Sequence, residues 1–144
     1  MKVKMIPPAL TEAISPYWRP IKYSLFPPLG LAQLAAYLTP EDDVSILDEH
    51  VEPLHLEDTP DLVVIATPAE TVPGLVTQCG EAGVAGLIIL SAGFSEVGDR
   101  GREFEQQLAK NIDRFPDMRV IGPNCLGVMV PNSRLNASFA AGMA

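Results

Sequence analysis

The sequence predicts an α/β protein with a doubly wound, five-stranded parallel sheet of strand order 2-1-3-4-5, in three α/β/α layers. Five short runs rich in Val, Ile and Leu occur along the chain, and helical patterns lie between several of them. Continuous apolar runs are typical of parallel strands that are buried on both faces. Their alternation with helices favours right-handed crossovers between strands. The expected strands are residues 3–6, 44–47, 61–66, 86–91 and 119–121.

A long proline-rich loop and a helix are expected between the first two strands. Residues 7–27 contain five prolines and show no clean period. Loops of this length inside a domain are usually functional or mobile. Pro28 then opens a segment with one apolar face, formed by Leu31, Leu34, Ala35 and Leu38. This spacing predicts a helix over residues 29–38.

Two more helices are expected in the second half of the chain. Thr71 can cap a helix that has Pro73 in its first turn and stops at Gly83. Residues 99–114 are charged and amphipathic, which predicts the other helix. One edge strand is expected near residues 136–139. All of this fits one domain, because a chain of 144 residues can bury a single sizeable core.

The composition restricts the partners that the protein can have. The formal net charge is −8, made of −5 over residues 1–60 (4 basic, 9 acidic) and −3 over residues 61–144 (6 basic, 9 acidic). Both halves repel a phosphate backbone, which argues against nucleic acid as a partner. No apolar run approaches the roughly 20 residues of a membrane span, so no membrane partner is expected. Cys79 and Cys125 form no Cys-x-x-Cys pair, so we expect a reducing cytoplasm and no metal.

Ligands of doubly wound sheets bind outside the carboxyl ends of the strands, where the winding reverses. In this chain that point lies between the first and third strands. The loop of residues 7–27 and the ends of the last three strands therefore share one rim. The candidate binding residues on these strand ends are Thr67, Pro68, Ala69, Glu70, Ser91, Ala92, Gly93, Phe94, Pro123, Asn124 and Cys125.

The motifs of common nucleotide sites and of hydrolases are missing from the sequence. Neither a Gly-x-Gly-x-x-Gly loop after the first strand nor a Gly-x-x-x-x-Gly-Lys-Ser/Thr loop occurs. His50 and His55 are interpreted as solvated, because a metal site needs a third ligand. Cys125 is either a reactive thiol or, as is commoner for a lone cysteine, small filler. We expect no catalytic residues.

The aromatic residues of the long loop leave two interpretations open. Tyr17, Trp18 and Tyr23 could stack on a planar ligand, or they could be apolar anchors that hold the loop on the domain. The residues alone favour neither.

Three stretches, DLVVIATPAETVPGLV, LIILSAGFSEVGDRG and RVIGPNCLG, carry a family resemblance. Through them residues 61–144 resemble the CoA-binding, Rossmann-like domain of the NDP-forming acyl-CoA synthetases, relatives of the succinyl-CoA synthetase alpha subunit. The resemblance implies that Thr67, Pro68, Ser91, Ala92 and Gly93 line a CoA groove. It also implies that Pro123, Asn124 and Cys125 face the place where the thiol end of CoA meets phosphohistidine chemistry.

The first 60 residues carry a different resemblance. The stretch MIPPALTEAISPYWRPIKYSLFPPLG, followed by DVSILDEHVEPLHLEDTPDLV, is similar to the N-terminal cobalamin-binding-type domain of radical SAM proteins, which is flavodoxin-like. Both resemblances lack a part that is essential to the family concerned. The synthetase side has no glycine-rich loop after the first strand and no phosphohistidine domain, and the radical SAM side has no Cys-x-x-x-Cys-x-x-Cys motif.

Together the two resemblances predict a single hybrid domain over residues 1–144, with a seam near residues 58–66. On this hypothesis the chain is an engineered chimera of flavodoxin-like order without catalytic activity, made to test whether fragments of two α/β folds are compatible. An alternative is weak binding of CoA or another nucleotide-like small ligand by Thr67 to Glu70 and Ser91 to Phe94. A second alternative is a cobalamin-type ligand. No enzyme activity and no resident cofactor are expected.

Overall fold

Five parallel strands form the central sheet of the computed structural model, in the order β2-β1-β3-β4-β5. The structure describes residues 1–6, 34–36, 38–47, 55–56, 58–133 and 135–138. The predicted fold class and strand order are confirmed. The strands are β1 (Lys2–Ile6), β2 (Asp43–Ile46), β3 (Leu62–Ile65), β4 (Gly86–Ile89) and β5 (Arg119–Ile121).

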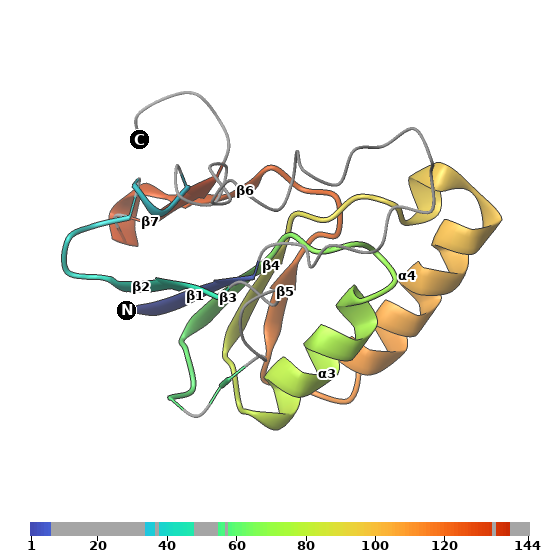
Figure 1. Ribbon diagram of the computed structural model, residues 1–144, viewed down its shortest axis with the longest axis horizontal. Coiled ribbons are helices and arrows are strands. Elements are labelled where there is room, and N and C mark those ends of the chain that lie inside the picture. The colour runs from blue at the N-terminus through green and yellow to red at the C-terminus, as the bar shows by residue number, and fades with distance from the viewer. Residues whose placement is uncertain (7–33, 37, 48–54, 57, 134, 139–144) are drawn as a thin grey trace, which may run out of the picture.

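Two helices cover one face of the sheet, as Figure 1 shows. They are α3 (Val72–Glu81) and α4 (Asp99–Ile112). Val72, Leu75 and Val76 of α3 pack with Val63 and Ile65 of β3 in one buried cluster. Helix α3 begins where the sequence predicts it, with a proline in its first turn.

The predicted cap of α3 differs in one detail. Thr71 is the N-cap residue, but its side chain makes no capping hydrogen bond to the helix. Its hydroxyl lies 2.8 Å from both the Pro68 carbonyl oxygen and the Thr67 hydroxyl. The Thr71 side chain therefore stabilises the loop before the helix and does not cap the first turn of the helix.

An antiparallel hairpin lies on the opposite side of the sheet from α3 and α4 (Figure 1). Its strands are β6 (Gly127–Val130) and β7 (Leu135–Ser138), joined through the short 3₁₀ turn η2 (Pro131–Ser133). The sequence predicts only one strand here, near residues 136–139. Ala137 packs in a second buried cluster with Val3, Met5, Val64 and Ile88, so the hairpin completes that face of the core.

Some expectations lie mostly or wholly outside the described residues. The long loop of residues 7–27, with Tyr17, Trp18 and Tyr23, is among them, as is His50. Of the helix predicted over residues 29–38, the structure describes Leu34 and Ala35 as helical, and Leu34 is fully buried. In the ranges that are described, no helix is long and apolar enough to span a lipid bilayer.

Helix α4 extends past the start of α3 at the carboxyl edge of the sheet (Figure 1). The Asn111 side chain, in the last turn of α4, donates a 2.8 Å hydrogen bond to the Pro73 carbonyl in the first turn of α3. Since an α-helix rises about 1.5 Å per residue, the turns of α4 before Asn111 reach well beyond that contact. The first turn of α4 therefore overhangs the rim.

The first turn of α4 also touches the loop after β4. A Cβ atom at Gly101 would lie 1.7 Å from the Phe94 carbonyl oxygen, whereas one at Gly74 in α3 would meet nothing within 4 Å. We expect Gly101→Ala to lower the free energy of unfolding by roughly 1–3 kcal/mol through overpacking. Gly74→Ala, the matched control, should raise it by about 0.5–1 kcal/mol. Urea unfolding of both variants measures this, and equal effects would contradict the close contact.

Cys79 of α3 lies in the core, and its burial makes the free energy of unfolding depend on pH in the alkaline range. Burial raises the pKa of its thiol from 9.0 to about 12. The unfolded chain therefore loses this proton first, so the thiol's contribution to stability is complete below pH 9 and is lost as the pH rises towards 12. We expect the free energy of unfolding of Cys79→Ala to fall less steeply between pH 9 and 11, by up to about 1.4 kcal/mol per pH unit. Parallel slopes for the two proteins would refute the burial argument.

Candidate functional site

Three loops at the carboxyl ends of β3, β4 and β5 lie together at the rim. The Asn124 backbone N–H donates a 2.9 Å hydrogen bond to the Ser91 carbonyl. The Cys125 thiol donates to the Ile89 carbonyl, at 3.2 Å. A Cβ atom placed on Gly93 would lie 3.1 Å from that of Ala69. The structure thus brings together the three predicted segments, residues 67–70, 91–94 and 123–125.

The turn after β5 requires glycine at position 122. Gly122 has a φ of +104°, and a Cβ atom there would lie 2.3 Å from the Ile89 carbonyl oxygen. The next two residues complete the turn, with a cis bond before Pro123 and a φ of 53° at Asn124. This shape places Asn124 and Cys125 over the end of β4.

The predicted site residues differ in what they can offer to a ligand. Ala69 and Phe94 have side chains buried in the core, with Phe94 only 1% exposed. The predicted binding role of these two can therefore apply only to their backbone. Thr67 is also buried, and its hydroxyl meets that of Thr71. The exposed or half-buried members are Pro68, Glu70, Ala92, Gly93, Pro123, Asn124 and Cys125.

Ser91 carries the one side-chain oxygen that is buried without a hydrogen-bond partner among the described residues. The residue is 7% exposed, and its Oγ exposes less than 1 Å². A buried hydroxyl without a partner costs free energy. Such a group, next to the end of a central strand, makes Ser91 a candidate member of the site.

Two carboxylates that the sequence reasoning did not identify hold the loop after β4. Glu96, in the 3₁₀ turn η1 (Ser95–Val97), accepts a hydrogen bond from the Gly93 backbone N–H. This bond, with others from the backbone of Glu96 itself and Phe94, lowers the pKa of the Glu96 carboxyl. Glu105 of α4 accepts from the Ser95 N–H at 3.0 Å. The loop shape is therefore fixed by its own acidic side chains.

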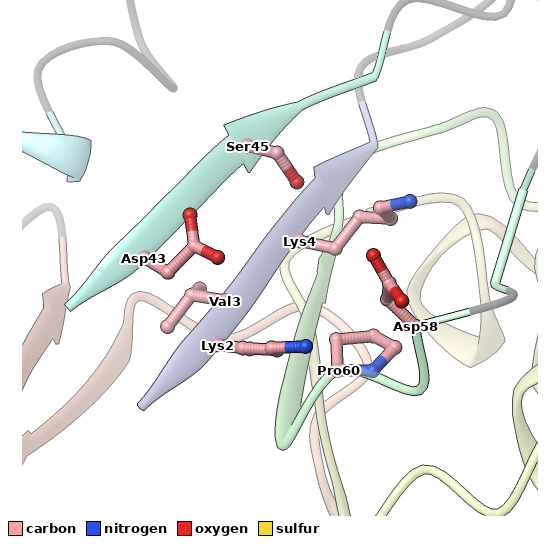
Figure 2. Close-up of a pocket in the computed structure, with 7 residues that line it drawn as sticks. All are labelled: Lys2, Val3, Lys4, Asp43, Ser45, Asp58 and Pro60. Atoms are coloured by element: carbon pink, nitrogen blue, oxygen red, sulfur yellow. The ribbon is translucent and has the colours of Figure 1, made fainter.

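A hollow lies against β1 and β2, away from these loops. Figure 2 shows the side chains of Lys2 and Lys4 extending to the side of β1 where Asp58 and Pro60 lie. Asp43 and Ser45 of β2 line its other wall. Two lysines facing two aspartates leave no surplus of positive charge, so this hollow does not favour an anionic ligand.

Comparisons with known proteins give a family for most of the chain. A family model described as a CoA binding domain matches residues 39–131. An ADP-forming acetate–CoA ligase of Methanocaldococcus jannaschii is 46% identical over 87 residues, which are 60% of this chain and 12% of the ligase. The alpha subunit of the ADP-forming acetate–CoA ligase II of Pyrococcus furiosus is 42% identical over 79 residues, 55% of this chain and 17% of the subunit.

Solved structures agree with this likeness. The apo form of the dinucleotide-forming acetyl-coenzyme A synthetase 1 of Ca. Korarchaeum cryptofilum matches with a TM-score of 0.68 and 25% identity. The match covers 97% of this chain and 30% of the synthetase chain. The protein PH0766 of Pyrococcus horikoshii gives a TM-score of 0.67 at 27% identity, over 97% of this chain and 31% of its own. The chain thus spans less than a third of each of these proteins.

These findings overturn the interpretation of the chain as an inert, engineered chimera. The family match crosses residues 58–66, the expected seam, without a break. One synthetase chain also accounts for the fold of both halves, including the part before residue 61. No finding supports a radical SAM segment or a cobalamin ligand. The resemblance of the second half to CoA-binding domains is confirmed.

The free energy of unfolding can test whether the Ser91 hydroxyl lacks a hydrogen-bond partner. Because its burial without a partner is unfavourable, we expect Ser91→Ala to raise the free energy of unfolding of the ligand-free protein, by about 1 kcal/mol. Ser45→Ala on β2, where the serine is exposed, should change it little. Chemical denaturation measures both. A clear loss of stability in Ser91→Ala would mean that the hydroxyl is already hydrogen-bonded.

Proposed function

The chain belongs to the family of CoA binding domains, and we propose that it binds CoA at the rim formed by residues 67–70, 91–94 and 123–125. The single observation that carries this proposal is the buried Ser91 hydroxyl without a partner, which lies inside the matched region. Members of a ligand site often keep such a group at a cost in stability, because it is satisfied only when the ligand binds.

The residues of the rim fit the chemistry of CoA. Ala92 and Gly93 are small, so a pantetheine chain or a diphosphate can approach the backbone closely. Ser91 offers a hydroxyl that can donate to a phosphate or carbonyl oxygen. The exposed Asn124 adds an amide that can donate and accept. When bound, CoA supplies a thiol that carries an acyl group.

We propose that the domain contributes CoA binding to an acyl-CoA ligase. The relatives are ADP-forming acetate–CoA ligases or their subunits, and a further relative from Nitrosopumilus maritimus is a 4-hydroxybutyrate–CoA ligase. This chain corresponds to 12–17% of those three proteins. Its partners are therefore the remaining parts of such a ligase. That the chain alone is not an enzyme, and that it works in the cytoplasm, stay predictions.

Titration calorimetry with CoA tests the proposal. We expect measurable binding to the unaltered chain and binding at least about tenfold weaker to Ser91→Ala, since a hydrogen bond to a charged group contributes about 1.5–3 kcal/mol. Ser45→Ala, a serine outside the rim, serves as the matched control and should bind like the unaltered chain. Absence of heat at millimolar CoA, or equal affinities of the two serine variants, would refute the assignment.

A further inference from the structure

Arg100 connects two of the rim segments through its guanidinium group. It lies in the first turn of α4, which overhangs the carboxyl edge of the sheet. Its Nη2 is 3.6 Å from Oε2 of Glu70, in the loop after β3. The Phe104 ring, one turn further along α4, lies 5.5 Å below the guanidinium carbon. The aromatic ring and the carboxylate together hold the positive charge over the rim.

The electrostatics of the rim make this charge important. Glu70, Glu96 and Asp99 all lie on the loops and first helical turn of this edge, whereas CoA carries several phosphate charges. In the part of the chain that the structure describes, the basic side chains at this edge are Arg100 and Arg102. Arg102 pairs with Asp99 on its own helix, while Arg100 pairs with a residue of a neighbouring loop. Arg100 is thus the described cation that lies between the loops.

The ion pair with Glu70 does not prevent Arg100 from binding a ligand. The side chain of Arg100 is 78% exposed and that of Glu70 is 49% exposed. Ion pairs between exposed side chains contribute little, because water screens both charges. A phosphate group offers the guanidinium two oxygens in a matching geometry and carries more charge than a carboxylate. The first turn of α4 adds the positive end of the helix dipole.

We propose that Arg100 exchanges Glu70 for a phosphate group of CoA, and that it thereby makes the rim selective for a phosphorylated ligand. The inference rests on the proposed function, because it assumes that CoA binds at this rim. In the ligand-free protein Glu70 is then the exchangeable partner of the guanidinium.

The chain contains a matched control for this pair. Arg114, just after α4, lies with its Nη2 3.6 Å from Oε1 of Glu81, and its guanidinium carbon is 5.2 Å from the Phe115 ring. The two pairs thus have the same charges, the same separation and the same aromatic support. Glu81 ends α3, so the second pair lies at the amino edge of the sheet, away from the rim.

Calorimetric titration with CoA distinguishes the two arginines. We expect Arg100→Gln to weaken CoA binding about tenfold or more, while Arg114→Gln binds like the unaltered chain. Arg100→Lys should lie between the two, because lysine keeps the charge but loses the planar fork. Glu70→Gln should bind CoA a few-fold more tightly, because the carboxylate that competes with the phosphate for Arg100 is removed. Raising the salt concentration should weaken binding more in the unaltered chain than in Arg100→Gln.

Each failure has its own signature. If the unaltered chain binds CoA and Arg100→Gln and Arg114→Gln have equal affinities, the role of Arg100 is overturned and the proposed function stands. If the unaltered chain itself does not bind CoA, the proposed function is overturned and this inference with it. Far-UV circular dichroism and thermal unfolding of the variants should match the unaltered chain, since both arginines are exposed.

Discussion

The contact between the first turn of α4 and the loop after β4 is the constraint on which the rim depends. Phe94 is buried in the core, and its carbonyl lies so close to Gly101 that no side chain fits between them. The loop cannot move away without uncovering the aromatic ring, and the helix cannot slide without meeting the loop backbone. The backbones of Ser91 on one side of this contact and of Arg100 on the other are thereby held at fixed positions.

The polar and charged groups at the rim have separate tasks. Backbone N–H groups of the loop are already used by Glu96 and Glu105, which give the loop its shape. The loop therefore differs from a glycine-rich phosphate loop, in which the backbone N–H groups are free to donate hydrogen bonds to the ligand. The groups that remain for a ligand under our proposals are the Ser91 hydroxyl, the Asn124 amide and the Arg100 guanidinium, whose partner is exchangeable. Structure and recognition use separate groups.

The sequence predicts the sheet well because each strand is a continuous apolar run, and the strand ends then locate the rim. It does not predict which rim side chains turn inward: Ala69 and Phe94 follow strands as Ala92 does, yet they pack in the core. Arg100 is missed because an arginine in a charged, amphipathic helix looks like an ordinary solvated residue. Strand β6 is missed because it directly follows the turn after β5 and so is read as part of that loop. For Ala69, which meets Gly93, and for Arg100, which meets Glu70, the deciding contact joins residues far apart in sequence.

Strand β3 shows why two unrelated fragments are a poor explanation of this chain. As a pattern, residues 62–65 satisfy any central parallel strand. In the structure all four are buried, and they alternate between two cores: Val63 and Ile65 pack under α3, whereas Leu62 and Val64 pack against Val3, Met5 and Ala137. The second core therefore contains residues from the beginning, middle and end of the chain. Close packing of this kind requires that side-chain volumes on both sides of the supposed seam match. The family match, which runs from residue 39 to 131 and so crosses this strand, agrees with such packing.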